Sequence, residues 1–573
     1  MKHAKKASFA AGLIALCYAL AAELPAYWVF LAMSAVISGL VLQSLGVVVG
    51  QAGMISLCQM SFAAIGAWTI GQLNVWGVPG GLYLWTPMAG LAAVPLGLLV
   101  GLPALRLRGV HLAIATLGFA SAVDVLLLTT TFPGSDSGIT IGRPMGLDSD
   151  RQYFLFCCTV FAIISVALRS VRRSRLGASW RALRESERAA AAAGTCVPHA
   201  KLSAFAVSAF IAGVSGALLA GQLAMVVSRN FDGMQSMAAY AVAVMVGAHH
   251  VEGALIGGVL GVLVSELLRR YGIPQQWSSL VFAAGAIQAL AQGAGMSDGL
   301  RAGVRSRRRR GLHSYSVPES PAAAPDHNTG DPKKFIDKPN ALEITGLTVR
   351  YGHVTAVDSV DLIVPSGTIV GLVGPNGAGK SSLVDAVSGF ISAVEGSVRI
   401  AGQSVEGLVV HQRARGGLRR TFQQDRVPTG LTVGEYLQFT ACRALTDEDI
   451  ANGLAGLIAA HPGDHIADLN VGTHRLLEVA GVMLARPVVA VLDEPAGGLA
   501  HTESERLGNW LASVPRRYGS AILLIEQDVD LVRTTCERVT VLDFGRVIAQ
   551  GPPNSVFNQP AVLRAYLGQG EGV

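Results

Sequence analysis

The glycines and the single lysine of residues 374–382 have the spacing of a phosphate-binding loop. The segment consists of Gly374, Pro375, Asn376, Gly377, Ala378, Gly379, Lys380, Ser381 and Ser382. It contains the pattern G-x-x-x-x-G-K-S, in which a glycine-rich turn presents backbone N–H groups to phosphates at the start of a helix. Lys380 would reach the β- and γ-phosphates, and the Ser381 hydroxyl would ligate Mg²⁺. The apolar run 368–373 predicts the buried strand that such a loop follows.

A second apolar run, 487–492, ends in the two carboxylates of Asp493 and Glu494. Beside a phosphate loop, Asp493 would hold Mg²⁺ and Glu494 would polarise the attacking water. Tyr351 precedes the loop, where its ring could stack on adenine, and Gln423 could sense the γ-phosphate and the metal. The sequence thus predicts ATP and Mg²⁺ as ligands, with Ser381, Gln423 and Asp493 around the metal. The expected nucleotide contacts are Tyr351, residues 374–382 and Asp493.

From about 341 to 568 the chain resembles the ATP-binding subunit of ABC transporters. The likeness is greatest to the ATPases of branched-chain amino acid importers. It rests on RTFQ at 420–423, LDEPAGGL at 492–499, LLIEQD at 523–528 and the tail at 551–568. The resemblance implies an α/β P-loop ATPase that hydrolyses ATP, with Glu494 and Gln423 among its catalytic residues.

Three features of the sequence depart from that family's pattern: two single residues and one motif. The family's switch histidine is Gln527 here, which can donate a hydrogen bond but cannot carry a proton charge. Ala500 replaces a polar D-loop residue. The signature motif, usually LSGGQ, is altered, and in the family it clamps ATP on the opposite subunit, so it would act on a partner's site. Because Glu494 is retained, we expect hydrolysis, with Gln527 as a third catalytic residue. The signature positions are Leu469, Asn470, Val471, Gly472 and Thr473.

The part of the chain before about residue 300 is strongly apolar. Hydrophobic residues make up 51% of the whole chain and charged residues 15%, and the mean hydropathy is +0.45. A membrane-spanning helix needs about 20 mostly apolar residues. Ten approximate spans follow from this pattern: 7–24, 27–49, 56–75, 84–104, 111–131, 153–170, 202–224, 235–249, 252–268 and 275–293. A signal peptide is the alternative for the first of them, 7–24.

Basic residues cluster beside these spans, as the positive-inside rule predicts for cytoplasmic loops. The net charge of +6 is therefore not read as a sign of nucleic-acid binding. Residues 301–340 include an arginine cluster and a Pro/Ala-rich stretch, which predicts a flexible linker whose basic part lies on anionic lipid. Sixty-seven glycines indicate helices that approach closely or are interrupted. At 50–62 glycines alternate with polar groups, which fits a discontinuous helix on a solute pathway or, alternatively, a cytoplasmic turn.

The front half resembles the permeases of branched-chain amino acid importers. The likeness covers about 27–300 and rests on residues 50–68, on LRLRGVHLAIATL at 105–117 and on GSDSG at 134–138. It implies an all-α polytopic permease. Asp124, alone in an apolar span, is functional, is held by a structural partner or lies near the membrane edge. Residues 177–194 predict a helix that resembles the coupling helix, which in the family docks beside the Gln423 loop; a solvated helix is the alternative.

The sequence therefore predicts a multidomain chain: a transmembrane permease domain at 1–300, a linker at 301–340 and an ATP-binding domain at 341–573. The resemblance implies import of branched-chain or related hydrophobic amino acids across a bacterial inner membrane, with the ATPase in the cytoplasm. It also implies a second permease and a second ATPase, as a homodimer or as separate subunits, and an extracytoplasmic solute-binding protein. Import of urea or short amides, or a non-hydrolysing membrane regulator clamped by ATP, are the alternatives.

Overall fold

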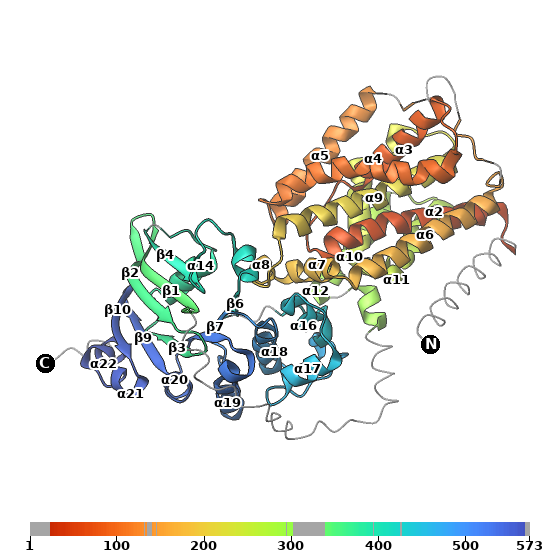
Figure 1. Cartoon of the computed structure of the whole chain (residues 1–573). Helices are drawn as coiled ribbons and strands as arrows, with labels where there is room; N and C mark the ends of the chain where they lie inside the picture. The colour runs from red at the N-terminus through yellow and green to blue at the C-terminus, as the bar shows by residue number, and fades with distance from the viewer. Residues whose placement is uncertain are drawn as a thin grey trace, which may run out of the picture. The chain divides into compact units, whose positions relative to one another are not determined.

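A computed structural model describes residues 23–130, 132–133, 140–144, 146–274, 276–293, 295–301, 339–393, 395–423 and 427–567. Contacts divide the chain into two compact units (Figure 1). Unit 1 comprises Met1–Trp180 and Pro198–Tyr315, and unit 2 comprises Arg181–Val197 and Ser316–Val573. The GSDSG segment at 134–138 and most of the expected linker lie outside the described residues.

The regular elements of unit 1 among its described residues are all helices. Its elements are α2 (Ala26–Leu45), the π-helix η1 (Gly46–Gln51), α3 (Gln59–Val75), α4 (Gly81–Ala104), α5 (Gly109–Thr129), α6 (Asp150–Arg172), α9 (Val197–Leu223), the 3₁₀-helix η2 (Ser228–Phe231), α10 (Gly233–Val246), α11 (Val251–Arg270) and α12 (Gln276–Gln292).

Each of the nine expected spans after residue 26 coincides with one of these helices. Among the described residues, six helices are long and apolar enough to cross a membrane: Ala26–Gln51, Gly81–Ala104, Gly109–Thr129, Asp150–Arg172, Val197–Leu223 and Val251–Arg270. The other three, α3, α10 and α12, have 17, 14 and 17 residues. The expected span 7–24 falls almost wholly outside the described residues, so the count of ten stays a prediction.

Glycines bring the helices of unit 1 into close contact, as their number predicted. A Cβ atom on Gly216 of α9 would lie 1.8 Å from the carbonyl oxygen of Ala63 on α3. A Cβ on Gly258 of α11 would lie 2.2 Å from the carbonyl oxygen of Ala35 on α2. Any larger residue at these positions would push the two helix backbones apart.

The glycine-rich stretch after α2 interrupts a helix. The chain passes from α2 into the π-helix η1, and residues 53–58 form no regular element before α3 begins at Gln59.

Asp124 has a structural partner, because its Oδ2 atom accepts the N–H of Gly233 at 2.8 Å, at the start of α10. An acceptor there satisfies a backbone donor that has no partner within the helix.

Unit 2 contains two β-sheets. In the four-stranded sheet the order is β2-β1-β4-β5, and all pairs are antiparallel. In the six-stranded sheet the order is β10-β9-β3-β8-β7-β6, parallel except for the β10 edge. The strands are β1 (Leu342–Tyr351), β2 (Val354–Val364), β3 (Ile369–Val373), β4 (Glu395–Ile400), β5 (Gln403–Ser404), β6 (Leu418–Arg420), β7 (Val489–Asp493), β8 (Ala521–Ile525), β9 (Arg538–Asp543) and β10 (Arg546–Gly551).

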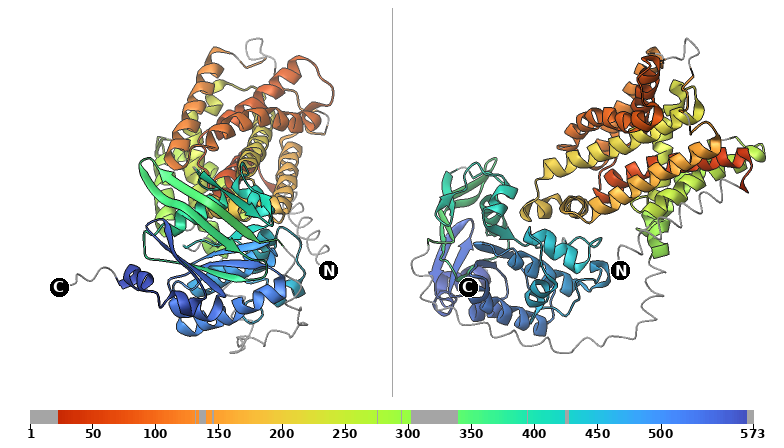
Figure 2. Two further views of the ribbon diagram at one scale, coloured as in Figure 1. Left: turned by 60° about the vertical axis from the view of Figure 1, so that its left-hand side comes forward. Right: turned by 45° about the vertical axis from the view of Figure 1, so that its right-hand side comes forward.

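Two hydrophobic cores hold these sheets. One lies between the antiparallel sheet and β3, β7 and β8, and the other lies between the parallel sheet and its helices. The two sheets approach each other through β2 and β10, and the two turned views show this (Figure 2). The three central strands β3, β7 and β8 are buried along their whole length, which explains their continuous apolar sequences.

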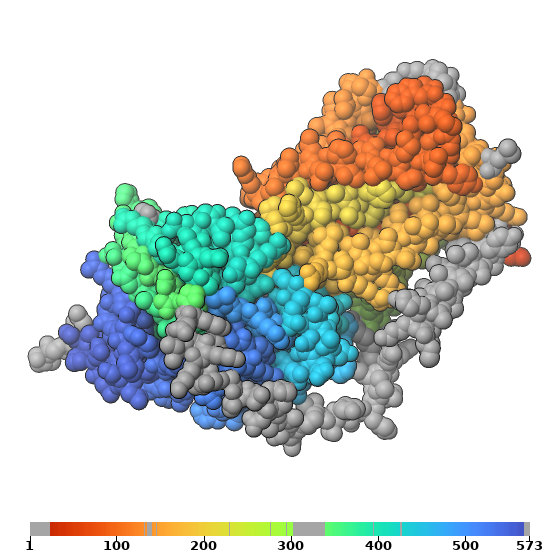
Figure 3. Space-filling model, in the orientation of Figure 1, coloured from red at the N-terminus to blue at the C-terminus, as the bar shows by residue number. Residues whose placement is uncertain are grey.

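The helices of unit 2 surround these sheets. Helices α16 and α17 pack on α18 and on each other. In the space-filling view, the cyan residues that include them gather at one end of the unit (Figure 3). The helices are α8 (Glu187–Ala192), α14 (Lys380–Ser388), α15 (Val410–Arg415), α16 (Val433–Ala441), α17 (Asp447–Leu454), the 3₁₀-helix η4 (Ile466–Asp468), α18 (Val471–Leu484), α19 (His501–Tyr518), α20 (Val529–Thr535), α21 (Pro553–Val556) and α22 (Pro560–Leu567).

The segment Arg181–Val197 belongs to unit 2. The single helix expected over 177–194 is wrong, because α7 (Arg175–Glu185) ends and α8 begins two residues later. Ser186 separates them: its backbone is extended and its side chain accepts the N–H of Ala189 at 3.2 Å, which caps α8. Gly194 follows the end of α8 and has a φ of +87°. The alanines at 189, 190, 192 and 193 line a groove with Arg419, Phe422 and Tyr436. The expected docking beside the Gln423 loop is therefore present.

Candidate functional site

The glycines of the phosphate-binding loop occupy conformations that other residues avoid. The loop joins the buried strand β3 to helix α14, which begins at Lys380. Gly377 and Gly379 have φ angles of +85° and +99°, in the left-handed region. A Cβ on Gly374 would lie 2.0 Å from the Leu542 carbonyl oxygen. The strand, loop and helix order that the motif requires is thus present, and backbone N–H groups are brought to the start of α14.

Lys380 is buried in this loop. Its Nζ atom donates to the carbonyl oxygens of Gly374 and Pro375 at 2.6 and 2.9 Å. Burial lowers the pKa of Lys380, and the negative charges of Glu494 and Asp493 oppose that shift. A buried ammonium whose hydrogen bonds go to neutral carbonyls fits an anionic phosphate ligand, which would compensate its charge better.

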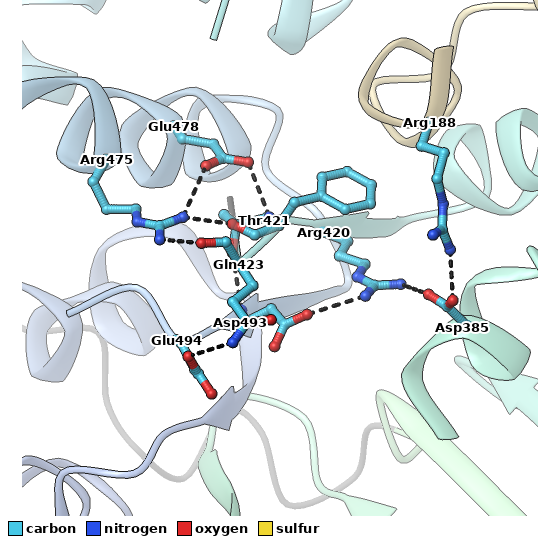
Figure 4. A network of polar contacts seen from close by, with 10 residues as sticks. Arg188, Asp385, Arg420, Thr421, Gln423, Arg475, Glu478, Asp493 and Glu494 are labelled. Carbon is cyan, nitrogen blue, oxygen red and sulfur yellow. Dashed lines mark hydrogen bonds and ion pairs between the residues drawn. The ribbon is translucent and has the colours of Figure 1, made fainter. Parts of the chain in front are cut away.

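Asp493 ends strand β7 and is held by the segment before Gln423. Arg420 Nη2 lies 3.0 Å from Asp493 Oδ2, and the Thr421 hydroxyl accepts the Asp493 N–H at 2.9 Å (Figure 4). Burial raises the pKa of Asp493, and the charge of Arg420 opposes the shift. The Asp493 carboxylate therefore pairs with a cation, the guanidinium, and a metal ion bound there would compete with Arg420 for it. Ser381, on the first turn of α14, and Gln423 would complete the donor set for a divalent cation.

The structure brings three predicted catalytic residues together. Gln423 Nε2 donates to Glu494 Oε2 at 2.9 Å, and Gln527 Nε2 donates to Glu494 Oε1 at 2.7 Å. Gln527 also lies 3.2 Å from Asn376 Oδ1 of the phosphate-binding loop. Because β3, β8 and β7 are parallel neighbours, the segments that follow them meet at one edge of the sheet. The proximity is a finding, while the catalytic roles stay predictions.

Residues that the sequence did not single out position this cluster. Arg475 donates to the carbonyl oxygens of Phe422, at 2.6 Å, and Gln423, while Glu478 accepts the Phe422 N–H at 3.0 Å. Both lie on α18, three residues apart. This i,i+3 spacing of opposite charges, directly after the signature, is the sequence pattern that could have pointed to them. Glu526, next to Gln527, accepts the N–H of Ala496 at 2.8 Å. Burial raises the pKa of Glu526, and backbone donors oppose this shift.

The remaining predicted nucleotide contacts lie at the border of the loop. Tyr351 is half-exposed at the end of β1, and its hydroxyl lies 3.5 Å from the Ser382 hydroxyl. The ring is therefore accessible to a ligand beside the first turn of α14. Its stacking on adenine stays a prediction.

The signature residues lie at the start of another helix, α18. Asn470 caps this helix by accepting the Thr473 N–H at 2.7 Å. Leu469 packs against the core, whereas Val471 is 74% exposed. Gly472 approaches Glu503, whose Oε2 would lie 3.2 Å from an added Cβ. The motif thus presents a capped helix start and an apolar side chain to the surface.

Unit 1 contains an open cavity of about 600 Å³ beside the interrupted helix. Ile55 and Leu57 of the irregular stretch line it, together with residues of α5, α10 and α12. The lining is mainly aliphatic, with a few polar groups that include Gln235, Tyr240 and Ser279. The cavity therefore favours an apolar occupant with limited polar contacts.

Family models match both halves of the chain. Residues 24–290 match the permease component of the branched-chain amino acid transport system, and residues 357–497 match the ABC transporter model. Residues 546–572 match the branched-chain amino acid ATP-binding cassette transporter model.

Individual proteins match each half in turn. The high-affinity branched-chain amino acid transport ATP-binding protein BraF of Pseudomonas aeruginosa is 34% identical over 253 residues, which cover 40% of this chain and 98% of BraF. The corresponding permease protein LivM of Salmonella typhimurium is 35% identical over 258 residues, 40% of this chain and 60% of LivM. A solved nucleotide-free ATP-binding cassette from an ABC transporter aligns with 40% of this chain and all of its own, at 24% identity and a TM-score of 0.36.

The family models and the two relatives agree with the site geometry in unit 2 and the apolar helices in unit 1. The chain belongs to the branched-chain amino acid ABC transporter family, and it is a multi-pass membrane protein that carries a permease region and a nucleotide-binding ATPase domain in one polypeptide.

Proposed function

We propose that this chain imports branched-chain or related hydrophobic amino acids with energy from ATP hydrolysis. The observation that carries the proposal is that both halves, in one polypeptide, match components of the same transport system. The aliphatic cavity of unit 1 supports a solute with a branched apolar side chain, and its few polar groups suit a small polar head. The interrupted helix that lines the cavity is then part of the solute pathway.

The residues around the phosphate-binding loop take the following roles in this proposal. Glu494 orients and polarises the attacking water, and Gln423 and Gln527 hold its carboxylate in place. Lys380 and the loop N–H groups bind the β- and γ-phosphates, and Tyr351 stacks on the base. Ser381, Gln423 and Asp493 hold Mg²⁺. When bound, Mg²⁺ supplies positive charge that neutralises the developing charge on the phosphates.

A second permease and a second ATPase complete the proposed transporter. The signature residues 469–473 then contact the nucleotide of the partner ATPase, and the exposure of Val471 supports a surface that another chain covers. The altered signature favours separate partner subunits over a second copy of this chain. An extracytoplasmic solute-binding protein delivers the amino acid. The segment Arg181–Val197 transmits nucleotide-driven movements to the permease helices that adjoin it in the chain.

Solute uptake by membrane vesicles tests this proposal. The vesicles contain the full chain and its partner subunits, with the ATPase exposed on the outside. The solute-binding protein and leucine are enclosed in the lumen, and ATP is added outside. We expect ATP-dependent transport of leucine from the lumen to the outside. The isosteric Glu494→Gln change should lower this rate about 100-fold or more, because a residue that positions or accepts a proton contributes about 10²–10⁴.

The alternatives give different results in the same experiment. Transport of urea but not of leucine would replace the proposed substrate. ATP binding without any difference in ATP turnover between the wild type and Glu494→Gln would indicate a non-hydrolysing regulator.

A further inference from the structure

Arg420 is a buried cation shared by two carboxylates. Its Nη1 atom lies 2.5 Å from Asp385 Oδ1 on α14, and its Nη2 atom lies 3.0 Å from Asp493 Oδ2 on β7 (Figure 4). The Arg420 side chain is 5% exposed, and its Nε atom has no hydrogen-bond partner among the described residues. The two carboxylates therefore decide where this guanidinium lies.

Asp385 is in turn shared with a second arginine. Its other oxygen, Oδ2, lies 2.5 Å from Nη2 of Arg188 on α8, so one carboxylate joins two guanidinium groups. The guanidinium carbons of Arg188 and Arg420 lie 4.5 and 5.9 Å from the centre of the Phe390 ring. All four charged residues belong to unit 2.

These contacts connect the segment Arg181–Val197 to the carboxylate expected to hold Mg²⁺. We propose that Arg188 is a positioning residue that regulates divalent-cation binding at Asp493, through Asp385 and Arg420. This inference rests on the proposed function, in which Asp493 holds Mg²⁺. It assigns to the segment a direct electrostatic link with the metal ligand, in addition to its packing in the groove.

The direction of the effect follows from the charges. Arg188 neutralises part of the Asp385 charge and repels Arg420, and both effects leave Arg420 on Asp493. When Arg188 withdraws, Asp385 attracts Arg420 more strongly, and Asp493 becomes available to a metal ion. When Asp385 loses its charge, Asp493 is the one carboxylate of the two that still pairs with Arg420. A metal ion must then displace Arg420 from Asp493.

Binding of Mn²⁺, used in place of Mg²⁺, measures this without catalysis. The full chain in lipid nanodiscs is saturated with a non-hydrolysable ATP analogue, and free Mn²⁺ is measured by electron paramagnetic resonance. We expect Arg188→Ala to raise the Mn²⁺ affinity about threefold, since the Arg188 side chain is partly exposed. We expect Asp385→Asn to lower it about tenfold, because it removes a buried charged hydrogen bond.

Two controls separate this link from other effects. Arg181 belongs to the same segment and pairs with Glu435 at 3.0 Å, away from Asp385. Arg181→Ala therefore removes a positive charge from the segment and leaves the pair of Arg188 with Asp385 in place, so Mn²⁺ affinity should be unchanged. Arg420→Lys keeps the charge but loses the planar fork that bridges two carboxylates. In that background Arg188→Ala should have no effect.

The outcomes are distinct. Opposite shifts for Arg188→Ala and Asp385→Asn, absent in Arg181→Ala and abolished by Arg420→Lys, support the inference. Shifts of the same sign, no shift, or an Arg188→Ala effect that persists with Lys at position 420 would overturn it. If wild-type protein binds no Mn²⁺ together with the nucleotide analogue, the proposed function itself fails.

Discussion

Unit 1 and unit 2 bury different kinds of polar side chain. Among the described residues, those buried in unit 1 are mainly amides and hydroxyls, such as Gln59 and Ser208. Lys201 and Glu266 are charged exceptions. The Lys201 Nζ atom donates to the Ala104 carbonyl oxygen at 2.9 Å, at the end of α4, and Glu266 Oε1 lies 2.8 Å from Arg269 Nη2. Unit 2 instead buries charges close to its candidate site. These are Lys380, Arg419, Arg420, Glu478, Asp493 and Glu526.

The difference follows from the surroundings of each unit. Within a bilayer an uncompensated charge costs several kcal/mol. Neutral side chains that form hydrogen bonds between helices fix the helix positions without this cost. In a water-exposed ATPase, buried charges can be balanced by one another in one state and by a charged ligand in another. The polar groups of unit 1 therefore hold helices together, whereas those of unit 2 lie where we expect a charged ligand to bind.

Loss of the buried cation should have the largest effect. Arg420→Leu leaves Asp385 and Asp493 without their shared partner, and we expect it to lower the unfolding free energy of the ATPase domain by about 3–5 kcal/mol. Arg546→Leu is the control, because its pair with Asp358 at 2.6 Å is largely exposed and should cost less than about 1 kcal/mol. Nucleotide-free thermal unfolding of both variants checks the difference. Equal losses would remove the distinction between buried and exposed charges.

A steric change in unit 1 should come next. Gly216→Leu would force α9 away from α3, where a Cβ would lie 1.8 Å from the Ala63 carbonyl oxygen. We expect a loss of about 1–3 kcal/mol or more, because such overpacking moves backbone. The matched control is Gly118→Leu on α5, where nothing lies within 4 Å of an added Cβ. Melting temperatures in detergent compare them, and a wild-type value for Gly216→Leu would contradict the close packing.

A neutral hydrogen bond in unit 1 should matter less. The Ser208 hydroxyl accepts from Gln59 Nε2 at 2.8 Å and donates to the Ser44 carbonyl oxygen at 2.8 Å. Ser208→Ala should therefore destabilise unit 1 by about 1 kcal/mol. Ser121→Ala should change nothing measurable, since that exposed hydroxyl bonds within its own helix. A larger loss for Ser208→Ala than for Gly216→Leu would reverse the expected order.

The smallest effect concerns pH. Burial raises the pKa of Asp493, and only the ionised carboxylate can ligate a metal. The Mg²⁺ concentration that half-saturates ATP turnover should therefore rise as pH falls toward that raised pKa. The Gln59 and Ser208 pair cannot titrate, so it gives unit 1 no comparable pH dependence. If Asp493→Asn shows the same pH slope as the wild type, titration of the nucleotide phosphates explains the effect.

Much of the candidate site could be predicted from short segments. The phosphate-binding loop, Asp493 and Glu494 each follow a buried apolar run, and that local pattern is sufficient to place them at strand ends. The break at Ser186 was missed because an alanine-rich stretch favours a continuous helix, and a serine cap overrode that preference. Arg475 and Glu478 were missed because they hold backbone atoms of another segment, and their i,i+3 spacing alone does not indicate which segment they contact.

The sequence by itself determined which segments are apolar enough to enter a membrane and which loop can hold phosphates, because both properties depend on neighbouring residues. Only the tertiary structure decided that Arg188 meets Asp385, 197 positions away, and that Arg420 lies between Asp385 and Asp493. Ion pairs between distant segments depend on how the chain packs, and no local pattern specifies which of several arginines reaches which carboxylate.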